Sequence, residues 1–151
     1  MDNHWNYRAG YLTTQLLLSR IKKDFPGREI PKIPSYTWRD TLEKSGIHYV
    51  VLGMKNKGER RFYPTCLNPR SIENVKYKFP CPEGFTAPWD FERRFTIKED
   101  STGLTILFIR DSFGQQIITF VRVLFQESVF IFDAWQYKLK PDIVVFLTLD
   151  S

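Results

Sequence analysis

The fold is decided by the last third of the chain, which opens with the stretch LTILFIRDSFG at residues 104–114. Residues 104–109 form a continuous apolar run of strand length, and residues 110–114 are typical of a short loop. Residues 115–125 then have helical periodicity. The apolar residues on one side of this predicted helix are Ile117, Ile118, Val121, Leu124 and Phe125. The stretch therefore predicts a strand, a loop and a helix in immediate succession.

Two further apolar strands are predicted downstream, at residues 129–132 and 143–147, with a short helical connector at residues 134–139 between them. Apolar strands that alternate with helices are typical of a parallel sheet whose two faces are both covered. The sequence therefore predicts an α/β fold built on a parallel sheet.

The first part of the chain is less regular. A helix is predicted over residues 7–25, followed by Pro26-Gly27 as a stop signal. The residues that give its helical spacing are Leu12, Leu16, Leu17 and Ile21. A short helix at residues 37–44 and a strand at residues 48–52 are also predicted.

Residues 53–101 show no clear periodicity and hold five of the nine prolines. These five are Pro64, Pro69, Pro80, Pro82 and Pro88. We expect loops and short strands here, forming an irregular insertion of the kind that often carries function.

The composition is that of one globular domain: 151 residues, 42% hydrophobic and 16% aromatic. The net charge is +5, with the basic residues scattered. A solvated surface is the simplest interpretation, and attraction to an anionic partner is the functional one. No RNA-recognition, zinc-finger or helix-turn-helix signature is present, so no nucleic-acid partner is expected. A nucleic-acid binder would reveal itself by strongly salt-dependent affinity.

The cysteine and histidine content argues against a zinc site, and no cofactor is expected. Cys66 and Cys81 are the only cysteines, and His4 and His48 the only histidines, so a zinc site would lack ligands. The two cysteines fit a disulfide or two buried thiols equally well. No apolar run is long enough to cross a bilayer, and no leader resembles a signal peptide.

Ser112 is the candidate nucleophile. Ligands of open α/β sheets gather outside the carboxyl ends of the strands, and the loop at residues 110–114 directly follows one of them. Backbone N–H groups at the start of the next helix favour negative charge and would stabilise an oxyanion, with Gly114 allowing a tight turn. The alternative is structural, since Asp-Ser before a helix is a common N-cap.

A serine nucleophile needs a base, and His4 is the candidate. Asp2 lies two residues earlier, and in an extended segment such residues project to the same side. The carboxylate of Asp2 would then orient the imidazole and stabilise it when protonated. The alternative is an unstructured start to the chain, because the first residues of domains usually fray.

Three blocks of this sequence resemble AlgX/AlgJ-type polysaccharide O-acetyltransferases, which act on polymers such as alginate. The first is Asp2-Asn3-His4-Trp5-Asn6 with Ala9-Gly10-Tyr11 behind it, similar to that family's D-x-H-W block. Ile109-Arg110-Asp111-Ser112-Phe113-Gly114 resembles its nucleophile block, and Lys140-Pro141-Asp142-Ile143-Val144-Val145 resembles a later strand. The Asp/His block precedes the serine block, as in that family and opposite to the order of ordinary SGNH hydrolases.

The resemblance implies a flavodoxin-like, three-layer SGNH-hydrolase-like fold. Residues 1–151 would form a single domain with residues 53–101 as an insertion, and the domain would be incomplete at its N-terminus. In the implied Ser-His-Asp triad, Ser112 is the nucleophile, His4 the general base and Asp2 its orienting partner.

The implied activity moves acetyl groups on or off a cell-envelope exopolysaccharide, as an O-acetyltransferase or an esterase. Its partners would be a polysaccharide acceptor and an acetyl donor, for which a membrane-bound acyltransferase is a candidate, and its location would be the periplasm or cell envelope. The residues expected to contact substrate are Trp5, Arg110, Phe113 and Gly114. Arg110 occupies a position where SGNH proteins usually have glycine.

A second hypothesis is a catalytically inactive, carbohydrate-binding remnant of the same fold. The candidate sugar-binding residues would then be Trp5, Trp89 and Trp135, and Ser112 would be a helix cap. Sugar binding that survives Ser112→Ala and is lost on Trp→Ala would distinguish this hypothesis from the enzyme.

Overall fold

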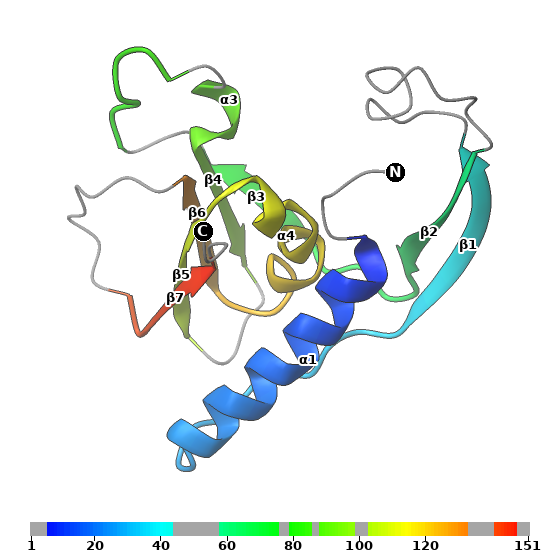
Figure 1. Ribbon diagram of the computed structural model, residues 1–151. Coiled ribbons are helices and arrows are strands. Elements are labelled where there is room, and N and C mark those ends of the chain that lie inside the picture. The colour runs from blue at the N-terminus through cyan, green and yellow to red at the C-terminus, as the bar shows by residue number, and fades with distance from the viewer. Residues whose placement is uncertain are drawn as a thin grey trace.

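The computed structural model describes residues 6–43, 58–75, 79–85, 88–98, 103–132 and 141–147. A five-stranded sheet forms the core, and a separate two-stranded hairpin lies beside it (Figure 1). The elements are α1 (Tyr7–Asp24), β1 (Tyr36–Glu43), β2 (Glu59–Cys66), β3 (Ile72–Val75), α3 (Pro88–Phe91), β4 (Glu92–Ile97), β5 (Thr105–Arg110), the 3₁₀ turn η1 (Ser112–Gly114), α4 (Gln115–Val121), β6 (Glu127–Phe132) and β7 (Ile143–Leu147).

The core sheet has the strand order β3-β4-β6-β5-β7 and is mixed, not wholly parallel. β5 pairs in parallel with both β6 and β7, whereas β4 is antiparallel to β6 and β3 is antiparallel to β4. The predicted α/β class is confirmed, but the all-parallel sheet is wrong for β3 and β4. The reason is that α3 ends beside the carboxyl end of β6. β4 begins there, with Glu92 opposite Ile131, and therefore runs antiparallel to β6.

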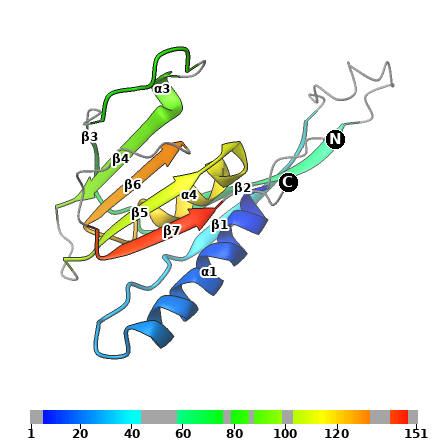
Figure 2. The same cartoon turned by 60° about the vertical axis from the view of Figure 1, so that its left-hand side comes forward.

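The two faces of the sheet bury separate apolar clusters. α1 and α4 cover one face, as Figure 2 shows. The sheet residues buried under these helices are Phe95, Ile106, Phe108, Phe130 and Ile143. The opposite face buries a second set, Leu107, Ile109, Val129 and Ile131, with Phe91 of α3. Successive strand residues point to opposite faces, so these apolar runs supply both layers of the core.

The hairpin β1–β2 corrects one prediction, because residues 37–44 were expected to be helical and the structure has a strand at Tyr36–Glu43. β1 and β2 pair antiparallel over their whole length, from Tyr36 opposite Cys66 to Glu43 opposite Glu59. Aromatic and β-branched residues dominate the start of β1 and favour a strand.

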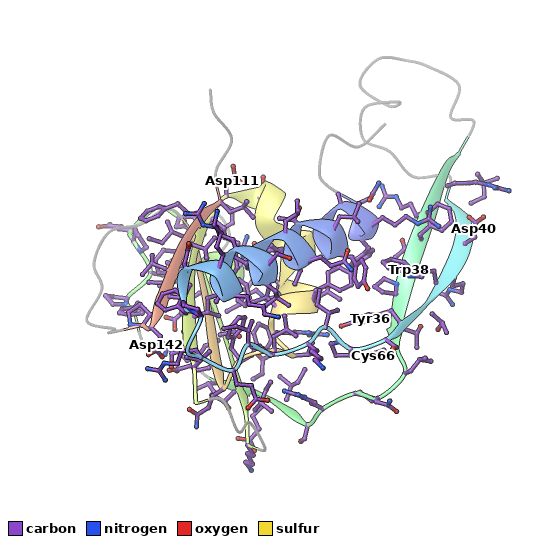
Figure 3. The ribbon with its side chains drawn as sticks, turned by 90° about the horizontal axis from the view of Figure 1, so that it is seen from below. Tyr36, Trp38, Asp40, Cys66, Asp111 and Asp142 are labelled. Carbon is purple, nitrogen blue, oxygen red and sulfur yellow. The ribbon has the colours of Figure 1, made fainter. Side chains whose placement is uncertain are left out.

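The same strand attaches the hairpin to the helices. The rings of Tyr36 and Trp38 pack on Tyr11 of α1 and Phe120 of α4, with centroid distances of 5.2–6.3 Å. Figure 3 labels Tyr36, Trp38 and Cys66 on this hairpin. Aromatic contact therefore decides the conformation of this segment, which helical propensity alone mispredicted.

The remaining strand and helix predictions agree with the structure where it describes them. α1, β5, β6 and β7 are confirmed. α4 ends at Val121, before the predicted Phe125, because the chain turns there and the N–H of Leu124 donates to the carbonyl of Val121 at 3.0 Å. The predicted strand at 48–52 and the connector at 134–139 lie outside the described residues. Within the described part of the chain, no helix is long and apolar enough to span a membrane.

Asp142, from the third block of the sequence resemblance, anchors the start of β7. Its carboxylate accepts a hydrogen bond from the N–H of Thr105 at 2.9 Å, and its own N–H donates to the carbonyl of Thr105 at 3.1 Å. Asp142 and Asp111 lie at opposite ends of the parallel strands (Figure 3). Asp142 therefore has a structural role at the end of the strands opposite to Asp111.

Candidate active site

The three parallel strands end side by side at one edge of the sheet. Arg110, the last residue of β5, is paired with Phe132 of β6 and Leu147 of β7. Asp111 follows, and Ser112 then opens the 3₁₀ turn that leads into α4. Ser112 is exposed. The carboxyl edge where ligands of α/β sheets gather therefore presents this serine to solvent.

Arg110 is fully buried, with 0% of its side chain exposed, and it ties the serine loop to α3. Its guanidinium donates to the Asp90 carboxylate at 2.8 Å and to the Asp90 carbonyl at 3.1 Å. It also donates to the carbonyl of Asp111 at 3.1 Å and lies over the ring of Phe132 at 4.8 Å. Burial lowers the pKa of Arg110, and Asp90 opposes this shift. In this structure Arg110 holds the backbone just before Ser112, and its predicted contact with substrate stays a prediction.

Gly114 is required by packing and not by backbone strain. Its φ of −71° is open to any residue. A Cβ on Gly114 would lie 2.9 Å from Cβ of Arg110 and 3.3 Å from a methyl of Leu147. Its N–H donates to the carbonyl of Asp111 at 3.3 Å. The tight loop therefore depends on Gly114 for close contact with Arg110, and the N–H of Gly114 is already engaged within the turn.

The start of α1 lies directly against the start of α4. A Cβ added to Gly10 would be 2.9 Å from the carbonyl oxygen of Gln116 and 3.2 Å from the nitrogen of Ile117. The side chain of Asn6 caps α1 by accepting the N–H of Ala9 at 2.9 Å. Two sequence blocks that are distant along the chain thus meet where α1 and α4 both begin.

Several predicted site residues fall beyond what the structure describes. Asp2, His4 and Trp5 lie outside the described residues, as does the side chain of Phe113. Ser112, Arg110 and Gly114 are brought together in one loop. The triad of Ser112, His4 and Asp2 therefore stays a prediction.

Sequence reasoning missed Asp90, which lies in α3 and accepts two hydrogen bonds from Arg110. It also missed a buried ionic cluster next to α3. Arg94 of β4 donates to the Glu92 carboxylate at 2.9 Å and to the Glu127 carboxylate at 2.6 Å. The other oxygen of Glu92 accepts the N–H of Phe79 at 2.8 Å. The available signal was ERRFTI, a strand-length stretch that opens with three consecutive charged residues, of which Glu92 and Arg94 are buried.

The described residues show no metal site and no disulfide. No cluster of three or more His, Cys, Asp or Glu side chains among them is arranged to hold a metal ion. Cys66 and Cys81 are both free thiols in this structure.

No protein-family model and no curated protein match this sequence. Its structure does match solved structures. One of Bacillus cereus PatB1 matches with a TM-score of 0.70 at 15% identity, covering 98% of this chain and 60% of that one. PatB1 with a sulfonyl adduct matches at 0.67 and 18% identity, over 98% of this chain and 58% of that one. A DHHW family protein from Eubacterium siraeum matches at 0.63 and 14% identity, over 97% of this chain and 57% of that one.

These matches establish the fold and show how much of each matched chain this protein covers. The chain has a mixed α/β fold similar to that of PatB1 and spans about three fifths of the matched chains, from 57% to 60%. At identities of 14–18% the likeness concerns the arrangement of the backbone and not the residues of the site.

Proposed function

We propose that this protein is a serine-dependent acyl-transfer enzyme, with Ser112 as nucleophile, His4 as general base and Asp2 as the residue that orients His4. The observation that carries the proposal is the position of Ser112. Ser112 is exposed and lies in the loop that follows the parallel strand β5. Buried Arg110 holds this loop by donating a hydrogen bond to the carbonyl of Asp111. This is the edge at which α/β folds place their ligands.

Three further observations support a triad that joins residues 2–4 to Ser112. Gly10 lies against the backbone of Gln116, so the segment that follows Asp2-Asn3-His4-Trp5 is packed beside the segment that follows Ser112. One matched structure belongs to a family whose name spells Asp-His-His-Trp, and three of these four letters recur at residues 2–5. Another carries a sulfonyl adduct, and sulfonyl reagents react with activated nucleophiles such as serine.

The proposed reaction has two steps. Oγ of Ser112 attacks the acetyl carbonyl of the donor while His4 takes the hydroxyl proton, and the donor oxygen leaves with that proton. The result is an acetyl ester on Ser112. A sugar hydroxyl then attacks this ester, its proton passes to His4, and Oγ of Ser112 leaves and recovers the proton. Water in place of the sugar hydroxyl makes the same site an esterase.

The proposed acceptor is a cell-envelope exopolysaccharide, and the proposed location of the reaction is the periplasm or cell envelope. Alginate is one candidate polymer, and a membrane-bound acyltransferase is a candidate donor of the acetyl group. The support is the sequence resemblance at residues 2–11, 109–114 and 140–145 together with the PatB1-like fold.

The test is hydrolysis of p-nitrophenyl acetate by the wild type and by Ser112→Ala and His4→Ala. Both variants should lose at least about 100-fold in kcat, since each removes a member of the reacting unit. Ser71→Ala is the matched control, because Ser71 is also exposed but precedes β3. Each variant is checked by circular dichroism.

A sulfonyl fluoride provides an independent readout by mass spectrometry. Labelling should map to Ser112 and disappear in Ser112→Ala. A folded wild type that neither turns over the ester nor accepts the label would overturn the enzyme proposal. The inactive carbohydrate-binding remnant would then be the better description.

A further inference from the structure

The helix α1 lies on the outside of the fold and carries two exposed leucines (Figure 2). Its inner side is buried through Gly10, Thr14 and Ile21. Leu12 and Leu16 are 58% and 72% exposed, and Leu16 is the most exposed large hydrophobic side chain that the structure describes. Residues four apart lie on one side of a helix, so the two leucines form one apolar patch. Single exposed leucines are ordinary, and the residues around them decide what this patch means.

Basic residues surround the two leucines. Further steps of four residues along the same ridge of α1 lead back to Arg8 and on to Arg20, and both of these arginines are exposed. Lys23, two turns after Leu16, is exposed on the same side of the helix. Asp24, the one acidic residue in the sequence of α1, pairs with Arg20 at 2.6 Å. The outward side of α1 therefore combines an apolar centre with an excess of positive charge.

The connector that follows α1 extends this charged surface. It turns back beside α1 (Figure 1) and encloses with it a groove of about 600 Å³. The charged residues that line the groove are Lys22, Arg28, Lys32 and Glu29. Phe25, where the chain leaves the helix, is 42% exposed and adds apolar surface at this end. Residues 7–32 hold six basic and two acidic residues, so this region carries most of the net charge of +5.

The charges and the small apolar area decide which kind of partner fits this surface. A second copy of the chain is disfavoured, because two basic surfaces would face each other. A protein partner is disfavoured, because lysine is depleted from protein interfaces and two leucines bury little of the area that a stable interface needs. A lipid bilayer takes up single apolar side chains, and its anionic headgroups attract nearby cations. Leucines on one side of a helix, flanked by lysine and arginine, are typical of helices that lie on membranes.

We propose that the outward side of α1 and the connector form a docking surface for a membrane that contains anionic phospholipids. Leu12, Leu16 and Phe25 insert among the lipid headgroups. The basic residues that contact the lipid phosphates are Lys22, Lys23, Arg28 and Lys32. The loop of Ser112 lies outside this docking surface, so membrane docking goes beyond the proposed acyl transfer and does not depend on it.

The test is co-sedimentation with vesicles made of equal parts of phosphatidylglycerol and phosphatidylcholine. The wild type should bind these vesicles but not vesicles of phosphatidylcholine alone, and added salt should weaken the binding by screening the charges. Lys22→Gln and Lys23→Gln should each weaken binding about fivefold. The double variant Leu12→Ala/Leu16→Ala should weaken it at least about tenfold, because the apolar side chains that enter the bilayer are shortened. All of these side chains are exposed, so the variants should remain folded, which circular dichroism checks.

Two matched controls lie outside the docking surface. Leu67, which follows β2, is 55% exposed, and the side chain of Lys98, which follows β4, is 69% exposed. Leu67→Ala, Lys98→Gln and Ser112→Ala should bind vesicles as the wild type does.

Three results would overturn the proposal. The wild type fails to bind the anionic vesicles, it binds phosphatidylcholine equally well, or the leucine and lysine variants bind as the wild type does. Sedimentation equilibrium without lipid tests the second copy as the occupant. A wild-type dimer that Leu12→Ala/Leu16→Ala dissociates would assign the surface to self-association and would also overturn membrane docking.

Discussion

The parallel and antiparallel halves of the sheet are built on different physical principles. In the parallel half, residues Ile106 to Ile109 of β5 are all apolar and no more than 2% exposed. In the antiparallel half, β4 buries Glu92 and Arg94 at 0% and 1% exposure, within the sequence ERRFTI. Apolar burial dominates the first half, whereas the second half adds a buried ion-pair cluster to its apolar residues Phe95 and Ile97.

The two halves also differ at the edge of the sheet where Ser112 lies. The parallel half ends in the loop with Ser112, and the antiparallel half lines most of a groove of about 670 Å³ beside that loop. A buried arginine links each half to its surroundings: Arg110 joins β5 to α3, and Arg94 joins β4 to Glu127 of β6. Breaking these two links separately shows how far the halves depend on charge.

The largest expected effect is from Arg94→Ala. This change leaves the fully buried Glu92 carboxylate without its cation and should lower the free energy of unfolding by about 3–5 kcal/mol. Urea denaturation measures the loss. The double variant Glu92→Gln/Arg94→Met should recover much of the stability, because neutral side chains then replace the buried Glu92–Arg94 pair.

The control for that experiment is Arg93→Ala, on the same strand. The side chain of Arg93 is 32% exposed and lies 4.0 Å from Asp90, so its loss should cost less than about 1 kcal/mol. Equal losses for Arg93→Ala and Arg94→Ala would show that the buried ion pairs do not hold the antiparallel half.

The next effect is from Arg110→Ala in the parallel half. The Asp90 carboxylate is 22% exposed, so water can replace part of what it loses, and the expected destabilisation is about 2 kcal/mol. Esterase activity should fall by more than the unfolded fraction explains, because the bond from Arg110 to the carbonyl of Asp111 is lost as well. Activity and denaturation are measured on the same samples, and an unchanged kcat would show that Arg110 does not position the serine loop.

Gly10→Ala tests the contact between the start of α1 and the start of α4. The new methyl would lie 2.9 Å from the backbone oxygen of Gln116, which cannot rotate away, and overpacking of this kind costs about 1–3 kcal/mol. Gly27→Ala is the control, because nothing lies within 4 Å of its Cβ position and its stability should be equal or slightly higher. Thermal denaturation compares the two variants, and equal melting temperatures would refute tight packing at Gly10.

The same contrast explains what the sequence predicted. Three elements were predictable from the spacing of their apolar residues, which marks the buried positions: the strands β5 and β7 and the helix α1. β4 was not placed because two of its buried positions, Glu92 and Arg94, are charged, and β1 was missed because its partner β2 lies beyond a long connection. Ser112 could be picked out from its place after β5. Asp90 could not, since its role appears only once α3 reaches Arg110 in space.

The smallest effect concerns the hairpin β1–β2. Apolar contacts attach this hairpin to α1 and α4, just as apolar contacts dominate the parallel half of the sheet. The hydroxyl of Tyr36 is buried without a partner, so Tyr36→Phe should change the free energy of unfolding at pH 8 by less than about 1 kcal/mol. Burial, and next the nearby Cys66, raises the pKa of Tyr36. An unfolded tyrosine ionises near pH 10, whereas folded Tyr36 stays neutral to higher pH. The free energy of unfolding is therefore unaffected by Tyr36 ionisation below about pH 10 and falls as the pH rises further.

Tyr36→Phe should therefore be more stable than the wild type at pH 11 although the two are nearly equal at pH 8. Urea denaturation at both pH values measures the difference. Parallel losses of stability in the two proteins would mean that the Tyr36 hydroxyl reaches water when the protein is folded. The hairpin would then be attached by a wetter and weaker contact than the aromatic packing on Tyr11 and Phe120 implies.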